Sequence, residues 1–435
     1  MKKVLIITYY WPPMGGGGVQ RWVKTTKYLR EYGWEPIIYT TKNGEIAIQD
    51  KELLKEIPEG IETIRTKIWE PFGLYKKLLG KKKEEALLPG MSQSSEGSSF
   101  LHNLSLWIRG NVFIPDARKF WIKPSSKFLI NYLKENKVDA IISTGPPHST
   151  HLIAKNVIKK HTIPWLADFR DPWTLIDFYH KLKLSNWADK KHKLLEQEVL
   201  HTANEVVTVT WSWANDFKEI SGRVPVVITN GYDPADFTAV EDVVLDKKFT
   251  LTHTGSLNED RNPHALWKVL AELAQKDEQF KNDLEIKFIG QVAAEVIQSI
   301  NQHQLQNNLK LVGSLPHNQV IEQMISSQLL LALLNNTPKN DGIIPGKLFE
   351  YIGAQRPIVA IGKPEGDAAK VIKETQAGTL TGFEEVDSLK EIINHHYAAY
   401  KSNSLKVNSK GYEKFSRRIL AKSFADELNK ISANQ

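Results

Sequence analysis

The amino-acid sequence predicts an α/β protein built from two doubly wound domains. Short apolar runs typical of buried strands alternate with amphipathic helical stretches along most of the chain. The length of 435 residues exceeds one ordinary hydrophobic core and suits two domains of about 200 residues each. A charged stretch at 241–248 separates two such alternating halves. We therefore expect a first domain at 1–240 and a second at 241–411.

Composition and charge restrict the class of protein. Hydrophobic content of 41% and charged content of 25% are ordinary for a soluble globular protein, and the absence of cysteine excludes disulfides and thiolate sites. A chain without disulfides fits the cytosol. The net charge of +7 permits nucleotide sugars, acidic lipid surfaces or nucleic acid as partners. No recognised nucleic-acid module occurs, so nucleic acid is not expected. The sequence contains no run of roughly 20 apolar residues, so no membrane span is expected.

The first domain opens with a strand at 4–8, a loop, a helix at 19–32 and a strand at 37–40. The loop runs through four glycines at 15–18. Glycines at a helix N-terminus let backbone N–H groups approach an anion closely, and the helix dipole favours negative charge there. The spacing fits neither the dinucleotide-binding pattern nor a P-loop. A flexible surface turn is the alternative interpretation.

The α/β regularity is lost between 69 and 123. Lysines gather in this region near aromatic residues, namely Lys76, Lys77, Lys81, Lys82 and Lys83 near Trp107, Phe113, Phe120 and Trp121. Such residues could form a basic, aromatic surface that contacts anionic lipid headgroups. The alternative is a solvated charge run beside ordinary core aromatics. A polar segment at 89–99 is expected to be a loop.

Regular alternation resumes afterwards. The expected strands are at 139–143, 164–168 and 205–210, and the expected helices are at 126–136, 148–160, 188–201 and 212–220. Because ligands of such sheets bind at the carboxyl ends of strands, the loops after the first two strands are candidate sites. They carry His148, Asp168, Arg170 and Asp171. A structural ion pair around Arg170 and a helix cap at His148 are the alternative interpretations.

The second domain repeats the pattern. The expected strands are at 249–254, 284–290, 309–312, 329–334 and 357–361, and the expected helices are at 263–275, 292–302, 318–326, 346–355 and 367–376. Lys347 and Glu350 lie at i and i+3 on one face of the helix at 346–355. A cation beside N-terminal amides suits a diphosphate, and a carboxylate one turn later can accept two hydroxyl hydrogen bonds from a ribose. A solvated surface pair is the alternative.

Three segments resemble family 4 glycosyltransferases. They are Pro-Pro-x-Gly-Gly-Gly after the first strand, Asn-Gly-x-Asp-x-x-x-Phe at 230–237, and Pro-Gly-Lys-Leu-Phe-Glu-Tyr at 345–351. The resemblance extends over nearly the whole chain and implies the GT-B fold, in which two Rossmann-like domains face a central cleft. It also implies that the last helix, within 412–435, packs back on the first domain.

The resemblance implies a retaining transferase. Such an enzyme moves a sugar from a nucleotide-diphosphate sugar to a glycan or lipid-linked acceptor in cell-surface polysaccharide or lipopolysaccharide-type assembly. No Asp-x-Asp motif occurs, so no metal and no other cofactor is expected. The absence of disulfides favours a cytoplasmic protein, and the basic, aromatic surface favours a peripheral place at the inner face of the plasma membrane. The enzymatic alternative is a nucleotide-sugar epimerase or hydrolase. A different alternative is a catalytically silent protein that binds a membrane surface.

The resemblance also assigns candidate residues. The donor-binding candidates are Gly16, Gly17, Gly18, Gly255, Ser256, Arg261, Lys347 and Glu350. The acceptor-side candidates are Arg21 and Arg170, and the catalytic candidates are Asp168, Asp171 and His148. Two positions depart from the family pattern, because Ser256 stands where an arginine is common and Gly342 stands where the first of two glutamates is expected. Asp341 is adjacent and is considered as the substitute for that glutamate.

Overall fold

The computed structural model describes residues 1–46, 49–70, 100–238, 240 and 243–433. The chain divides into two compact units, one formed by residues 1–229 with 417–435 and the other by residues 230–416. The division after residue 229 precedes the expected boundary at 240. The lysine cluster at 76–83 lies outside the described residues, so the surface expected there is not described. Among the described residues, no helix combines the length and apolar character of a membrane span.

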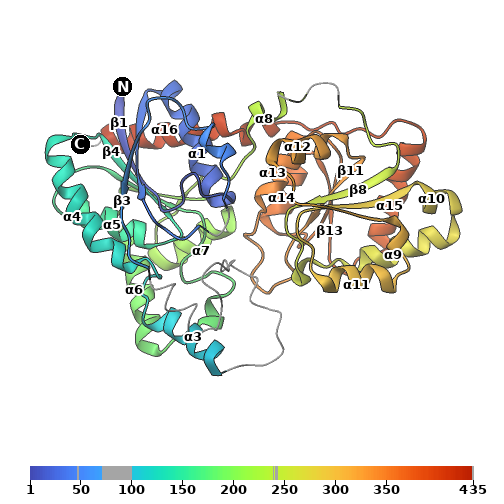
Figure 1. The fold of residues 1–435 in the computed structure, drawn as a ribbon, viewed down its shortest axis with the longest axis horizontal. Helices are drawn as coiled ribbons and strands as arrows, with labels where there is room; N and C mark the ends of the chain where they lie inside the picture. The colour runs from blue at the N-terminus through green and yellow to red at the C-terminus, as the bar shows by residue number, and fades with distance from the viewer. Residues whose placement is uncertain (47–48, 71–99, 239, 241–242, 434–435) are drawn as a thin grey trace. The chain divides into compact units, whose positions relative to one another are not determined.

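The first unit contains a parallel sheet of seven strands in the order β3-β2-β1-β4-β5-β6-β7 (Figure 1). Its strands are β1 (Lys2–Ile7), β2 (Trp34–Thr41), β3 (Glu62–Thr66), β4 (Ala140–Gly145), β5 (Trp165–Phe169), β6 (Glu205–Thr208) and β7 (Val226–Val227). Its α-helices are α1 (Gly17–Leu29), α3 (Phe100–Asn111), α4 (Lys119–Glu135), α5 (Ser149–Ile158), α6 (Asn186–Thr202), α7 (Trp211–Ser221) and α16 (Arg417–Ala433). Strands β4 and β5 are buried over their whole length and β1 is buried from Val4 onward, as expected for a sheet covered on both faces.

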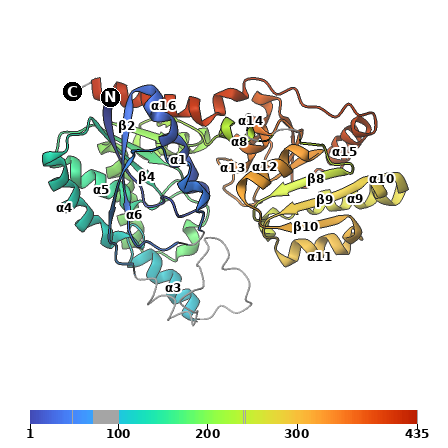
Figure 2. The ribbon, with the colours of Figure 1, turned by 45° about the horizontal axis from the view of Figure 1, so that its top comes forward.

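Helix α16 completes the core of the first unit although it comes last in the sequence. It lies beside α1 in both ribbon views (Figures 1 and 2). The rings of Trp22 and Phe424 have centroids 5.0 Å apart, and the Arg21 guanidinium lies 5.1 Å from the Phe424 ring centroid. The apolar stripe of the final helix is therefore buried against the first helix.

The second unit contains a parallel sheet of six strands in the order β10-β9-β8-β11-β12-β13. Its strands are β8 (Phe249–Thr254), β9 (Leu284–Ile289), β10 (Leu309–Gly313), β11 (Leu329–Leu333), β12 (Ile358–Ile361) and β13 (Gly378–Thr381). Its α-helices are α8 (Pro234–Thr238), α9 (His264–Lys276), α10 (Glu278–Asp283), α11 (Ala294–Gln302), α12 (His317–Ser326), α13 (Gly346–Gly353), α14 (Asp367–Thr375) and α15 (Val386–Lys401). Two parallel, doubly wound sheets confirm the predicted fold class.

Both sheets reverse their winding at one place. The strand order reverses between β1 and β4 in the first unit and between β8 and β11 in the second. In doubly wound sheets the crevice at this switch point lies at the carboxyl ends of the strands and holds ligands. The loops that follow these four strands are therefore the places to examine.

One correction to the sequence-based expectations concerns α4. The helix begins at Lys119 and contains Pro124, whereas the sequence predicted a start at 126. Trp121 is buried and its ring stacks on Tyr39 with centroids 5.5 Å apart. Trp121 is therefore a core residue and does not belong to an exposed aromatic surface.

Candidate functional site

Helix α13 presents the pair that the sequence singled out. Leu348, Phe349, Tyr351 and Ile352 of this helix are buried, which leaves Lys347 and Glu350 half-buried. The helix follows β11, so its first turn lies at the switch point of the second sheet. The sequence therefore directs one cation and one carboxylate to the end of the sheet where ligands bind.

Lys347 is held against the end of β8. Its Nζ donates hydrogen bonds to the Thr254 carbonyl oxygen and to His253 Nε2, the latter at 3.2 Å. Burial, together with the charge of Arg261, lowers the pKa of Lys347 to about 7, although Glu350 opposes the shift. A half-buried ammonium whose two hydrogen-bond partners are both uncharged is suited to an incoming anion.

The residue in the turn after β8 is a glycine, which leaves room for the Lys347 side chain. Gly255 has a φ of +87°, and a Cβ at this position would lie 2.9 Å from Lys347 Nζ. A Cβ on Gly290 would in turn lie 2.5 Å from the Gly255 carbonyl oxygen. A side chain at either position would therefore disturb the close approach of the lysine to the backbone.

Arg261 provides a second cation from the same loop. Its Nε donates to Asn335 Oδ1 at 2.5 Å, and its Nη1 donates to the Ser256 carbonyl oxygen at 3.2 Å. Burial lowers the pKa of Arg261, but a guanidinium stays charged at any working pH. Ser256 is exposed and contributes its backbone to this contact. Arg261 and Lys347 thus form a cationic pair in the second unit, close enough for the charge of Arg261 to lower the pKa of Lys347.

Asp341 does not behave as a substitute for the absent glutamate. Its carboxylate forms an ion pair with Lys363, and both side chains are more than 40% exposed. An exposed pair of this kind is an ordinary surface contact. The expectation that Asp341 replaces the missing carboxylate therefore receives no support from its contacts.

In the first unit, Arg21 and Asp168 form a buried structural pair. Arg21 Nη2 lies 2.9 Å from Asp168 Oδ1, and the guanidinium also donates to the carbonyl oxygens of Ile228 and Thr229. The Asp168 carboxylate accepts further hydrogen bonds from the side chains of Trp22 and Thr144. Burial alone raises the pKa of Asp168, but the Arg21 contacts outweigh it and the pKa is lowered.

These contacts favour a structural role for Asp168 and Arg21, while their assignments to the site stay predictions. Asp168 has no exposed surface and Arg21 is 1% exposed. Four of the five N–H donors of Arg21 already have partners within the unit. Asp168 was a catalytic candidate and Arg21 an acceptor-side candidate, whereas their positions fit stabilisation of the core.

Arg170 has a similar internal role. Its guanidinium donates to the carbonyl oxygens of Gly18, at 2.7 Å, Gly145, at 3.2 Å, and Pro146. A Cβ on Gly18 would collide with this guanidinium. Arg170 therefore ties the glycine-rich loop to the loop after β4, and its assignment to acceptor contact stays a prediction.

Two neighbours of Gly18 are placed differently. Gly16 has a φ of +99° and caps α1, and Gly17 begins the helix. A Cβ on either residue would have no heavy atom within 4 Å. The backbone of these two residues is therefore accessible, and they keep the anion-binding assignment as a prediction.

His148 and Asp171 are the remaining catalytic candidates. The His148 ring stacks on Trp173 with centroids 4.6 Å apart, and its Nδ1 has no hydrogen-bond partner among the described residues. Burial, with His151 and Arg170 nearby, holds the pKa of His148 well below its usual value, so the ring is neutral. Burial raises the pKa of the half-buried Asp171, for which the described residues offer no hydrogen bond or ion pair. The described residues thus leave hydrogen-bonding capacity unused on both groups, and their catalytic assignments stay predictions.

Helix α6 holds the loop that follows Asp171, which the sequence did not predict. Glu196 is buried and accepts hydrogen bonds from the backbone N–H groups of Trp173 and Thr174, at 3.0 and 3.3 Å. His192 Nδ1 accepts from Trp173 Nε1 at 3.0 Å. The spacing of His192 and Glu196 by four residues on one helical face was the available signal, but only the fold shows what that face meets.

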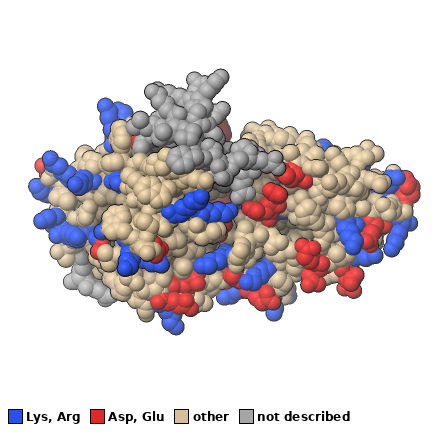
Figure 3. All heavy atoms as spheres, turned by 90° about the horizontal axis from the view of Figure 1, so that it is seen from below, with Lys and Arg blue, Asp and Glu red and all other residues tan. Residues whose placement is uncertain are grey.

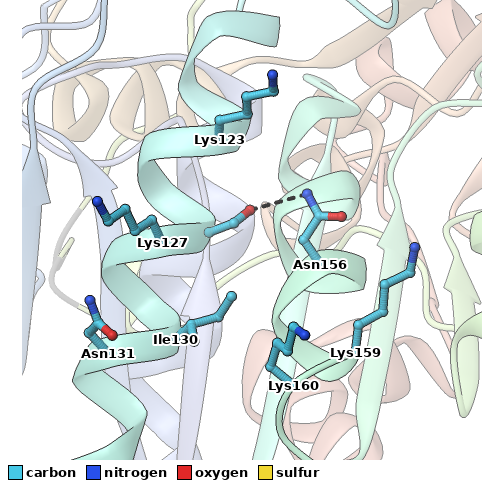
Figure 4. A pocket seen from close by; sticks show the side chains of 8 residues that line it. Lys123, Lys127, Ile130, Asn131, Asn156, Lys159 and Lys160 are labelled. Atoms are coloured by element: carbon cyan, nitrogen blue, oxygen red, sulfur yellow. Dashed lines mark hydrogen bonds between the residues drawn. The ribbon is translucent and has the colours of Figure 1, made fainter.

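A separate hollow lies between α4 and α5 (Figure 4). It has a volume of about 430 Å³ and is lined by Lys123, Ser126, Lys127, Ile130, Asn131, Asn156, Lys159 and Lys160. A hydrogen bond of 3.3 Å from Asn156 Nδ2 to Ser126 Oγ joins the two helices. The four lysines are exposed, and the described residues give none of them a carboxylate partner.

Comparison with known proteins finds a family similar to the second unit. Residues 238–409 match the family model described as glycosyl transferases group 1. Over these residues the chain is similar to that family. A search of curated protein sequences finds no match. The matched segment contains β8, α13 and the cationic pair of Arg261 and Lys347.

Solved structures with the same fold cover the whole chain. Sucrose-phosphate synthase from Thermosynechococcus elongatus is 12% identical with a TM-score of 0.62, and 100% of each chain is covered. Anabaena Alr3699/HepE in complex with UDP and glucose is 15% identical with a TM-score of 0.62, covering 99% of this chain and 100% of the other. A TarM mutant from S. aureus is 11% identical with a TM-score of 0.56, covering 99% and 100%. The fold is therefore GT-B, and together with the family match it supports a transferase.

Proposed function

We propose that this enzyme is a retaining family 4 glycosyltransferase that uses a nucleotide-diphosphate sugar. The observation that carries the proposal is the cationic pair at the switch point of the second sheet. Arg261 and Lys347 would contact the diphosphate, which also faces the N-terminus of α13. Glu350, one turn beyond Lys347, would accept hydrogen bonds from the ribose hydroxyls.

The same residues would assist departure of the diphosphate. Negative charge grows on the leaving diphosphate as its bond to the sugar breaks, and positioned cations stabilise that charge. We propose that Arg261 and Lys347 supply this charge without a metal ion, because the sequence contains no Asp-x-Asp motif. The departing phosphate oxygen would accept the proton of the acceptor hydroxyl on the same face of the sugar.

The first unit would supply the groups that face the acceptor and the transferred sugar. His148 is neutral with an unpartnered Nδ1, so it can accept or donate one hydrogen bond. Asp171 is a carboxyl whose charged form is disfavoured by burial. Gly16 and Gly17 offer accessible backbone at the start of α1. These assignments rest on the contacts of each residue within its own unit.

Two of the solved structures with the same fold support a nucleotide-sugar donor and a glycan acceptor. One solved neighbour holds UDP and glucose, and another holds UDP with α-GlcNAc-glycerol. We propose a glycan or lipid-linked acceptor in the assembly of a cell-surface polysaccharide. A nucleotide-sugar epimerase or hydrolase would act without an acceptor, and a silent protein would bind without turnover.

We propose that the enzyme acts at an anionic membrane surface. The lysines of the hollow between α4 and α5 lie on the first unit, where Figure 3 shows Lys and Arg atoms gathered. Phe120 and Phe128 of α4 are each 40% exposed. Basic and aromatic side chains together favour binding to anionic headgroups.

The membrane proposal is tested by sedimentation with vesicles of phosphatidylcholine with and without phosphatidylglycerol. Replacing the four hollow lysines by glutamine should abolish binding that depends on the anionic lipid. The matched control replaces four exposed lysines of the second unit, namely Lys248, Lys276, Lys373 and Lys406. Equal loss in both variants would indicate a general charge effect and would contradict this assignment.

The donor proposal is tested first by thermal shift with UDP, GDP, ADP and their common sugars, with and without Mg²⁺. One nucleotide class should raise the melting temperature without metal, because a bound ligand stabilises the folded state. Turnover then separates the alternatives. Release of the nucleotide only with an acceptor supports transfer, conversion without an acceptor supports the epimerase or hydrolase, and binding without turnover supports the silent protein.

A further inference from the structure

His253 is a buried polar residue at a position where the strand pattern favours an apolar one. Side chains of β8 alternate between the two faces of the sheet, so His253 shares a face with Phe249 and Leu251. Those two residues belong to the hydrophobic core of the second unit. His253 has no exposed surface and lies one residue before the end of the strand. A polar ring in this place needs a reason beyond packing.

The contacts of the ring determine which nitrogen carries the proton. Nδ1 lies 2.9 Å from the Leu331 carbonyl oxygen of β11, which can only accept, so Nδ1 is the donor. In a neutral imidazole the other nitrogen then accepts, and Nε2 lies 3.2 Å from Lys347 Nζ. Burial, followed by the charges of Lys347 and Arg261, holds the pKa of His253 well below its usual value. Backbone contacts of the ring with Leu331 and Ser256 oppose this shift but do not outweigh it, in agreement with a neutral ring.

We propose that His253 is a positioning residue for the donor diphosphate, because its neutral ring holds the Lys347 ammonium at the Gly255 turn. An ammonium has three N–H donors. One is directed to His253 Nε2 and another to the Thr254 carbonyl oxygen, which leaves the third for a phosphate oxygen. The inference rests on the proposed nucleotide-diphosphate donor and extends it to a residue outside the motif of α13.

The arrangement makes donor binding dependent on pH. Lys347 has a pKa of about 7 in the free protein, and a bound diphosphate would favour its charged form. The other groups that act on Lys347 are Arg261, which lowers this pKa, and Glu350, which raises it. The hydroxyl of Tyr351 in the same helix is neutral, since burial raises its pKa to about 12. Binding above pH 7 should therefore take up a proton, and affinity should fall as the pH rises.

The test compares two replacements of His253. Calorimetric titration with UDP, GDP and ADP, each alone, is performed between pH 6 and 9. His253→Leu removes the acceptor for Lys347 and should weaken binding about tenfold, with the alkaline loss of affinity displaced to lower pH. His253→Gln keeps an acceptor oxygen at a similar reach and should restore affinity to within about threefold, with the wild-type pH profile. Circular dichroism and melting temperature establish that each variant is folded.

Two controls separate positioning from general stability. His303→Leu removes a half-buried histidine of the same unit whose ring contacts the Ser299 carbonyl oxygen, and it should bind as the wild type does. In a Lys347→Met background, His253→Leu should cause no further loss, because the two residues act through one contact.

Wild-type affinity and pH profile in His253→Leu would overturn the inference, and so would an additive loss in the Lys347→Met background. In either case binding by the wild-type protein leaves the proposed function standing. Absence of binding of all three nucleotides to the wild-type protein would instead overturn the proposed function, and this inference with it.

Discussion

The environment of Lys347 makes both stability and ligand binding dependent on pH. Its pKa of about 7 in the folded protein lies well below the ordinary value of 10.5. The unfolded chain therefore holds more protons between these two values, and stability rises with pH across that window. Nucleotide affinity should fall over the same range, because the ligand needs the ammonium. A rise in stability and a fall in nucleotide affinity over the same pH range are therefore both expected from the titration of Lys347.

We expect Lys347→Met to flatten both trends. The melting temperature of the ligand-free protein is measured between pH 7 and 9 for the wild type and the variant, and the difference between them reports Lys347 alone. A Lys310→Met variant, which removes a lysine of the second unit with a more than half-exposed side chain, is the control. A wild-type slope in Lys347→Met would contradict the assignment.

Asp171 and Asp168 are close in sequence, but replacing each by asparagine should have opposite effects on stability. Because the pKa of Asp171 is raised, the folded state favours the neutral carboxyl over the carboxylate. Asp171→Asn should therefore keep or increase the free energy of unfolding at pH 7, while it lowers the rate of sugar transfer. Asp168→Asn leaves the buried Arg21 without its counter-charge and should cost roughly 3–5 kcal/mol. Urea unfolding and turnover are measured for both variants. A strong destabilisation by Asp171→Asn would indicate a structural role.

At the scale of elements, the sequence predicted most of the strands and helices that build the two sheets. β8 was predicted at the bounds that the structure has, because its apolar run is flanked by charged residues and glycine. β3 and β13 were not predicted. These edge strands contain few buried residues, so their apolar signal is weak.

The candidate site was predicted in part for a related reason. Lys347, Glu350 and Arg261 stand in motifs that local spacing reveals. His253 and Asn335 were missed, because their contacts to the two cations depend on strands that pair only in the folded sheet. The internal contacts of Arg21 and Arg170 were not predicted, since a sequence shows an arginine near acidic residues or glycines but not whether its donors face inward.

The packing of α16 on α1 allows an element-scale prediction. Phe424 is buried and contacts both the Trp22 ring and the Arg21 guanidinium. Phe424→Ala should destabilise the first unit by about 3–5 kcal/mol, through lost burial and the cavity that remains. Ile419→Ala, at a 40% exposed position of the same helix, should cost far less. Urea denaturation followed by tryptophan fluorescence measures both.

At the scale of the molecule, one unit is continuous in sequence and the other is not. Removal of residues 417–435 should therefore weaken the first unit and leave the second unit able to bind a nucleoside diphosphate. Hydrogen exchange should show lost protection in β1 and α1 but not in β8 and α13. The thermal shift caused by the nucleotide should persist. Equal loss of protection in both units would show that they unfold together.

The late position of α16 has a consequence during synthesis. Leu420, Phe424, Ala425, Leu428 and Ile431 belong to the core of the first unit, yet they follow the whole of the second unit in the chain. At about 5–20 residues per second, a ribosome needs roughly 10 to 40 seconds to translate residues 230–416. During that interval the nascent first unit exposes an apolar surface on α1 that only the final helix covers. We expect chaperones to be needed most at this stage. The second unit should complete its core before the first unit does.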